Sequence, residues 1–116
     1  MTPKPVSPQQ DAIDVFGRLH MRIHKAIEDC MDDAALDRLR VANESVAAVL
    51  TALNREDFHA RTADFATVAS TMKAATDQLE KLKEDIDRVI QDVALASEVA
   101  GGIEAALNAA SGLRVL

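Results

Sequence analysis

The sequence predicts an all-α protein, either an antiparallel helical hairpin or an up-and-down helical bundle with coiled-coil-like heptad packing. Apolar residues recur along it at alternating intervals of three and four, the spacing that places side chains on one face of an α-helix. Short polar stretches that suit helix caps separate these apolar patterns. Of the 116 residues, 48% are hydrophobic, four are glycine and three are proline, a composition that favours helices.

The first helix is expected to begin at Pro8 and to span about residues 8–31. Ser7 and Gln10 form a capping box around it, and proline suits the first helical position because its missing N–H is not needed there. Residues 1–7, which contain two further prolines, are expected to form a mobile leader. The apolar face of this helix comprises Ile13, Phe16, His20, Ile23, Ile27 and Cys30.

A second helix is expected over about residues 33–54, after a turn in which Asp32 or Asp33 is the N-cap. The step from the last apolar position of the first helix to Leu36 is six residues rather than four, which indicates a break between the helices. The apolar face of this helix comprises Leu36, Leu39, Asn43, Val46, Leu50 and Leu53. Asn43 is its polar member, and a polar side chain there predicts a device that sets register or oligomer number at a cost in stability.

The strongest periodicity lies in the C-terminal half, where Asp57 is the expected cap of a helix over about residues 57–99. Thirteen successive positions are apolar: Phe65, Val68, Met72, Ala75, Leu79, Leu82, Ile86, Val89, Val93, Ala96, Ala100, Ile103 and Leu107. Eight of them form the predicted interaction seam: Phe65, Val68, Met72, Leu79, Leu82, Ile86, Val89 and Val93. We expect this seam to pack against other helices.

The length of this pattern leaves two architectures open. An unbroken helix of about 45 residues would be about 65–70 Å long, twice the length of each of the first two helices. In one architecture those two helices lie end to end along it, and the resulting hairpin buries its remaining apolar faces in a homo-oligomer. In the other, the long helix breaks near Thr76–Asp77, where Asp77 and Glu80 form a capping box, and four segments form a bundle.

Small residues characterise the C-terminal segment. A predicted close-packing stripe recurs every four residues: Ser97, Gly101, Ala105 and Ala109. Such a stripe allows another helix to approach closely, and two nearby glutamates argue against membrane contact. Gly101 and Gly102 each weaken helical propensity by about 1 kcal/mol, so we expect a kink and a last helix over about residues 102–111. Residues 8–116 are therefore expected to form a single helical domain.

Three residues have the spacing of a metal site. His20, His24 and Glu28 follow one another at intervals of four, so a helix places them in a row on one face. Two imidazoles and a carboxylate suit a metal ion, but the chain lacks the pair of Glu-x-x-His helices that a di-iron bundle needs. The favoured interpretation places His20 at the edge of the core and the other two in solvent. We therefore expect no metal and no cofactor.

Charge and composition limit the partners. The formal net charge is −6, the isoelectric point is about 4.9, and there is no Trp or Tyr. Nucleic-acid binding requires clustered cations and is helped by aromatic side chains, so we expect no nucleic-acid partner. The single cysteine, Cys30, suits a reducing compartment, and Met1–Gln10 lacks the pattern of a cleaved signal peptide. We expect cytoplasmic residence, with export by a route that needs no cleaved signal as an alternative.

The sequence contains no P-loop, dinucleotide fingerprint, zinc-finger spacing, kinase signature or Gly-x-Ser-x-Gly motif, so we expect no enzyme activity. The favoured function is a helical protein–protein interaction module, such as an adaptor, a secretion-associated protein or a chaperone-like protein, that oligomerises through its heptad seam. Its partner would be a second copy or another protein, helical or basic. Two alternatives stay open: an acidic immunity-type inhibitor of a basic protein, and a bundle that binds a metal through His20, His24 and Glu28.

Overall fold

The computed structural model describes residues 8–54 and 64–112, and every regular element within these ranges is an α-helix. The helices are α1 (Pro8–Asp29), α2 (Asp33–Leu53), α3 (Asp64–Glu84), α4 (Ile86–Val89) and α5 (Val93–Gly112). Four of them have 20 to 22 residues, and α4 is a single turn. The all-α prediction is confirmed, whereas the expected leader and the expected caps Ser7 and Asp57 lie outside the described residues.

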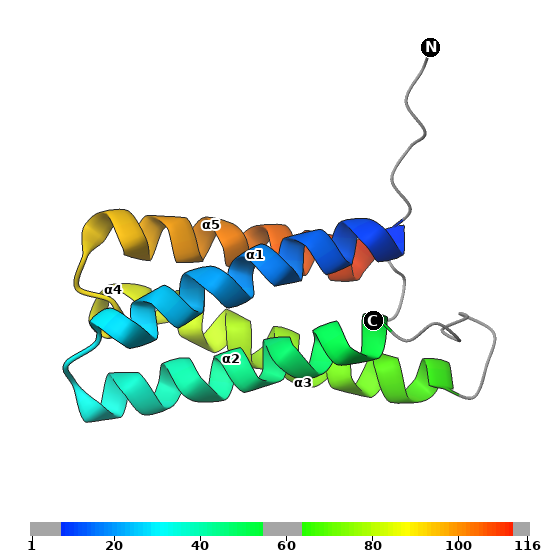
Figure 1. Ribbon diagram of the computed structural model, residues 1–116, viewed down its shortest axis with the longest axis horizontal. Helices are drawn as coiled ribbons and strands as arrows, with labels where there is room; N and C mark the ends of the chain where they lie inside the picture. Colours follow the sequence, from blue (N-terminus) through cyan, green and yellow to red (C-terminus); the bar gives the residue numbers. More distant parts are fainter. Residues whose placement is uncertain (1–7, 55–63, 113–116) are drawn as a thin grey trace, which may run out of the picture.

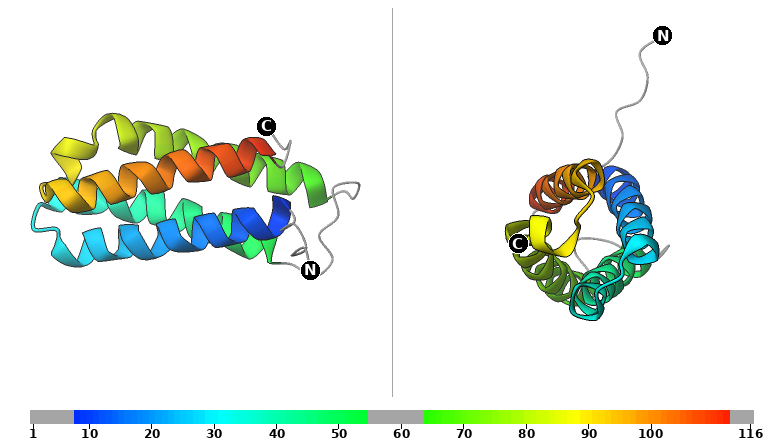
Figure 2. Two further views of the ribbon diagram at one scale, coloured as in Figure 1. Left: turned by 90° about the horizontal axis from the view of Figure 1, so that it is seen from above. Right: turned by 90° about the vertical axis from the view of Figure 1, so that its left-hand side faces the viewer.

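The four long helices run alternately up and down and form a compact bundle (Figure 1). Viewed along the bundle axis, their order around the ring is α1, α2, α3 and α5, so that α1 packs against both α2 and α5 (Figure 2). Of the two predicted architectures, the up-and-down bundle is therefore confirmed and the long hairpin is wrong. Coiled-coil-like heptad packing between these helices stays a prediction.

The core is a column of apolar side chains that runs along the bundle axis. Its largest fully buried members come from all four long helices: Phe16, Leu19, Ile23, Leu39, Val46, Val49, Leu53, Met72, Leu79, Leu82, Val99 and Ile103. The predicted seam from Met72 to Val89 lies inside this column, so these side chains are not free to form an interface between copies. The homo-oligomer stays a prediction. The sequence argument for it assumed that part of the seam is left unburied within one chain, but the seam members from Met72 to Val89 are buried.

The predicted continuous helix over residues 57–99 is wrong, because the chain leaves the helix after Val89. Ile90 is extended, with φ −117° and ψ 111°, and α5 begins three residues later. Asp92 caps α5, since its carboxylate accepts a hydrogen bond from the Leu95 N–H at 3.1 Å. A straight continuation would carry the apolar seam about 30 Å past the end of the bundle into water, whereas the reversal buries both halves.

The reversal also changes the register of the apolar pattern. Val93, the predicted eighth member of the seam, is 83% exposed. The buried face of α5 comprises Leu95, Ala96, Val99, Gly102, Ile103, Ala106, Ala109 and Ala110. The predicted break near Thr76–Asp77 is wrong as well, because both residues lie inside α3. The buried Ala75 and Leu79 on either side belong to one helical row, and this packing keeps the chain helical through a capping-box sequence.

In α1 the buried row is rotated by about one residue from the predicted face. It comprises Ala12, Phe16, Leu19, Ile23 and Ala26. His20 is partly buried, which agrees with its expected place at the edge of the core. The physical reason for the rotation is that α1 lies between α2 and α5, and its small alanines allow both neighbours to approach closely.

Gly101 and Gly102 lie inside α5, so the prediction that a separate helix begins at residue 102 is wrong. Gly102 faces α1, where a Cβ atom would lie 3.1 Å from Cδ1 of Leu19 and 3.4 Å from Nη1 of Arg22. A Cβ atom at Gly101 would meet nothing within 4 Å. Gly102 therefore permits the close contact between α1 and α5, and this packing outweighs its weak helical propensity.

Candidate functional site

A hollow of about 420 Å³ lies at the end of the bundle where the α1–α2 turn meets α4 and the α4–α5 connection. This end faces the viewer in the right-hand view of Figure 2. The buried part of its wall is apolar and comprises Ala26, Ala35, Val89, Ile90 and Leu95. The exposed polar part comprises Asp29, Asp32, Arg88, Gln91 and Asp92. The volume is at the small end of the range for ligand pockets, about 300–1,000 Å³.

Two aspartate caps shape this hollow. The Asp32 carboxylate accepts a hydrogen bond from the Ala35 N–H at 3.0 Å at the start of α2, which confirms one of the two predicted caps. Asp92 caps α5 in the same way, and both helices begin at this end because they alternate with the opposite direction of α1 and α3. The two carboxylates lie against the positive ends of the helix dipoles, so an anion would meet negative charge at both.

Beside the hollow, two apolar side chains project into solvent. Met31, which lines the hollow, is 99% exposed, and Val93, which follows the cap Asp92, is 83% exposed. We call the surface formed by residues 29–35 and 88–95 the hollow end. Met31 lies in the turn between α1 and α2, and Val93 is the first residue of α5 directly after a turn; binding residues often lie at such connections between helices.

The hollow end also holds polar groups with no partner in the described part of the chain. The side chains of Asp29, Arg88 and Gln91 form no hydrogen bond or ion pair with any residue in 8–54 or 64–112. The lining contains three carboxylates, those of Asp29, Asp32 and Asp92, and one guanidinium, that of Arg88. Its formal charge is therefore −2, from three negative groups and one positive group.

Cys30 is the one nucleophilic side chain in the lining. Its Sγ donates a hydrogen bond to the backbone oxygen of Asp32 at 3.3 Å, and the thiol is partly buried. Among the described residues that line the hollow there is no histidine beside the Cys30 thiol, the partner that activates a catalytic cysteine.

The three candidate metal ligands do not meet at one point. Nε2 of His24 lies 3.0 Å from Oε1 of Glu28, and both side chains are more than half exposed. His20 lies one turn away and is partly buried. Among the residues that the structure describes, no group of three or more His, Cys, Asp or Glu side chains is arranged to hold a metal ion. The geometry of His24 and Glu28 is that of a solvent-facing pair on one helix.

Asn43 is buried in the core and is 8% exposed. Its Oδ1 has no hydrogen-bond partner within the described residues. Thr76 is the other buried polar residue within the described ranges, and its hydroxyl donates to the backbone oxygen of Lys73 at 3.0 Å. A role of Asn43 in setting register or oligomer number stays a prediction.

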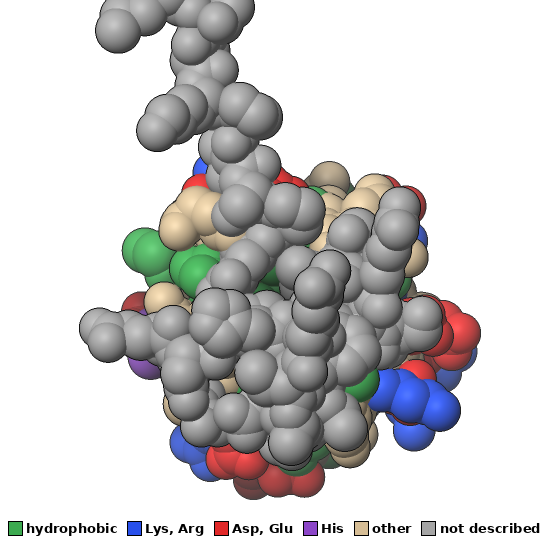
Figure 3. Space-filling view, turned by 90° about the vertical axis from the view of Figure 1, so that its right-hand side faces the viewer, with side chains coloured by type: hydrophobic (Ala, Val, Ile, Leu, Met, Phe, Trp, Pro, Cys, Tyr) green, Lys and Arg blue, Asp and Glu red, His purple; other side chains and the backbone are tan. Residues whose placement is uncertain are grey.

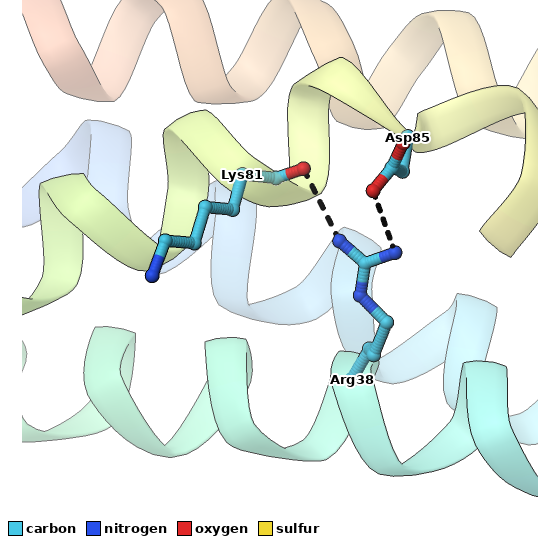
Figure 4. Close-up of polar contacts among 3 residues, drawn as sticks. All are labelled: Arg38, Lys81 and Asp85. Carbon is cyan, nitrogen blue, oxygen red and sulfur yellow. Dashed lines mark hydrogen bonds and ion pairs between the residues drawn. The ribbon is translucent and has the colours of Figure 1, made fainter.

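Arg38 was not singled out from the sequence. Its guanidinium contacts both Lys81 and Asp85 where α3 ends and α4 begins (Figure 4). Its Nη1 lies 2.9 Å from Oδ2 of Asp85, and its Nη2 donates to the Lys81 backbone oxygen at 3.2 Å. The Asp85 N–H is shared between the backbone oxygens of Lys81 and Leu82, at 3.4 Å and 3.2 Å, where α3 ends. Arg38 therefore supports a loosened helix end. No local signal could reveal it, because Lys81 is 43 residues away in the chain.

The predicted close-packing stripe faces solvent over most of its length. Ser97, Gly101 and Ala105 are exposed, and only Ala109 is buried. Within the chain, the close approach of α5 to α1 occurs at Gly102 rather than at these three residues, so their contact with a second protein stays a prediction. None of the helices in the described ranges has the length and apolar character needed to cross a membrane.

Two members of the predicted seam, Phe65 and Val68, have side chains outside the described set. Figure 3 shows the end of the bundle opposite the hollow, where hydrophobic, acidic and basic side chains all reach the surface. Comparison of the chain with known protein families, with curated proteins and with solved structures finds no match. The hollow end is the candidate site because it combines a hollow with an apolar lining and an exposed apolar side chain, Met31.

Proposed function

We propose that this chain is a non-enzymatic protein–protein interaction module and that the hollow end binds a segment of a partner protein. The observation that carries the proposal is the exposure of Met31 and Val93 near a hollow whose buried lining is apolar. We call this buried apolar lining the floor of the hollow. Covering apolar surface stabilises a complex by about 25 cal/mol per Å² removed from water, before the costs of association. A partner that covers both side chains and enters the hollow gains this term.

The same surface supplies specificity. The unpartnered Asp29, Arg88 and Gln91 surround the apolar floor, so a bound segment meets hydrogen-bonding groups at its edge. An apolar centre with a polar rim is the usual anatomy of a protein interface. An adaptor that presents a rigid helix end to partner segments fits this arrangement.

A peptide selection tests the proposal. Phage that display random 12-residue peptides are selected on the full immobilised chain, after depletion on the double variant Met31→Ser/Val93→Ser. Neither substitution removes a buried side chain, so the variant keeps its fold, which circular dichroism verifies. We expect enriched peptides that bind the native chain and lose at least tenfold in affinity on the double variant.

The matched control is Met21→Ser, since Met21 is 73% exposed on α1 and does not line the hollow. Enriched peptides should bind this variant as they bind the native chain. Failure to enrich any peptide, or equal binding to the double variant, would overturn the proposed function.

A further inference from the structure

We infer that the segment bound by the hollow end carries a lysine or arginine directly beside an apolar side chain. This inference rests on the proposed function and names the chemistry of the partner. Apolar side chains of the segment cover Met31 and Val93 and reach the buried apolar lining of the hollow, and the basic side chain lies against the carboxylates of the lining. Two features of the site, exposed apolar surface and excess negative charge, thus each specify one part of the partner.

The charge argument starts from the lining. Its three carboxylates and one guanidinium leave a formal charge of −2 in a concave surface, where a low-dielectric wall strengthens the field. The whole chain has a net charge of −6, which adds long-range attraction for a basic partner. Asp29 is the strongest single candidate for the contact, because it is exposed and its carboxylate has no partner in the described residues.

Other occupants fit the site less well. An anion would meet Asp32 and Asp92, whose carboxylates already lie at the N-termini of α2 and α5. A second copy that docked through the same hollow end would place two linings of charge −2 against each other, and this repulsion opposes symmetric pairing. A basic, apolar segment is free of both conflicts.

Substitution of Arg88 distinguishes a basic partner from an acidic one. Among the described residues of the lining it is the one cation, and no described residue neutralises it. If the partner is basic, Arg88 repels it and its removal strengthens binding. If the partner is acidic, Arg88 is the group that binds it and its removal weakens binding.

The test uses the highest-affinity peptide from the selection, synthesised with a fluorescent label, and fluorescence polarisation with the full chain. We expect Lys or Arg next to an apolar residue in the enriched sequences. Asp29→Asn should weaken binding about two- to fivefold, the range measured for exposed ion pairs, and Arg88→Gln should strengthen it. The control Asp77→Asn removes an exposed charge on α3 and should leave the affinity unchanged. Raising the salt concentration from 0.05 M to 0.5 M should weaken binding.

Two results overturn the inference while leaving the proposed function in place. One is enrichment of peptides that depend on Met31 and Val93 but are acidic or uncharged. The other is a peptide whose affinity is unchanged by Asp29→Asn or reduced by Arg88→Gln. If no peptide depends on Met31 and Val93, the proposed function itself fails.

Discussion

The middle of the bundle and its hollow end use apolar side chains in opposite ways. In the middle, Phe16, Leu39 and Leu79 are 0% exposed and interlock with residues of the neighbouring helices. At the hollow end, Met31 and Val93 are 99% and 83% exposed. The difference arises because the chain must reverse direction at a bundle end, where unpaired backbone groups need caps and the turns lie at the surface.

The comparison teaches that stability and binding are separated along this molecule. The middle holds the large buried side chains that stabilise the fold, whereas the hollow end holds exposed apolar groups and charges without partners. Substitutions in the middle should therefore change the free energy of unfolding, and substitutions at exposed hollow-end positions that cap no helix, such as Met31 and Asp29, should change binding alone.

The largest expected effect is at Leu82, a core residue in the last turn of α3 that is 2% exposed. Leu82→Ala should lower the free energy of unfolding by about 2–5 kcal/mol, because it removes buried methyl groups and leaves a cavity. Val93→Ala, at a position that the sequence assigns to the same seam, should cost under about 0.5 kcal/mol. Urea unfolding measures both, and similar midpoints would show that the two regions do not differ.

The next effect concerns the contact between α1 and α5. Gly102→Leu should cost about 1–3 kcal/mol, because a Cβ atom there already lies 3.1 Å from Leu19. Gly101→Leu should stabilise the protein by about 0.5–1 kcal/mol, since that position is open and leucine favours the helix. Thermal unfolding of the two variants compares them directly. Equal losses of stability would mean that α5 is not seated on α1 at Gly102.

A third comparison is between Asp92, which caps the start of α5, and Asp77, which lies inside α3 and caps no helix. Asp92→Ala should cost about 0.5–2 kcal/mol, because it removes the acceptor for the Leu95 N–H at the start of α5. Asp77→Ala, within α3 and exposed, should change stability by less than about 0.5 kcal/mol. The measurement is chemical denaturation of both variants. A larger loss for Asp77→Ala would indicate a helix start near residue 77 after all.

The smallest expected effect is a gain at Asn43. Asn43→Leu should raise the free energy of unfolding by about 1 kcal/mol, because Oδ1 is buried without a hydrogen-bond partner in the described residues. Asn108→Leu, an exposed asparagine on α5, is the control and should change stability little. Thermal unfolding with light scattering follows both stability and mass. A lower melting temperature for Asn43→Leu contradicts the expectation and shows that the amide is satisfied in the folded chain.

Several features of the fold were predictable because they depend on neighbours in the sequence. The apolar spacing identifies the helices, and the aspartate at position 32 marks the turn before α2. Seam members such as Met72 and Leu79 are buried as their spacing predicts, because a helix repeats over this short range whatever surrounds it. The −6 charge and the absence of Trp and Tyr limit the partners in the same direct way.

Only the tertiary structure decided where the long apolar pattern is interrupted and which face of each helix is buried. The pattern runs through Val89 and Val93 without a gap, yet the chain reverses between them so that α5 packs against α1. Leu19 rather than His20 enters the core because α1 must fit between two neighbours. The hollow end has the same origin: its lining comes from two turns about 60 residues apart, which only bundle closure brings together. Spacing specifies a helix face locally, whereas burial is a property of the whole assembly of helices.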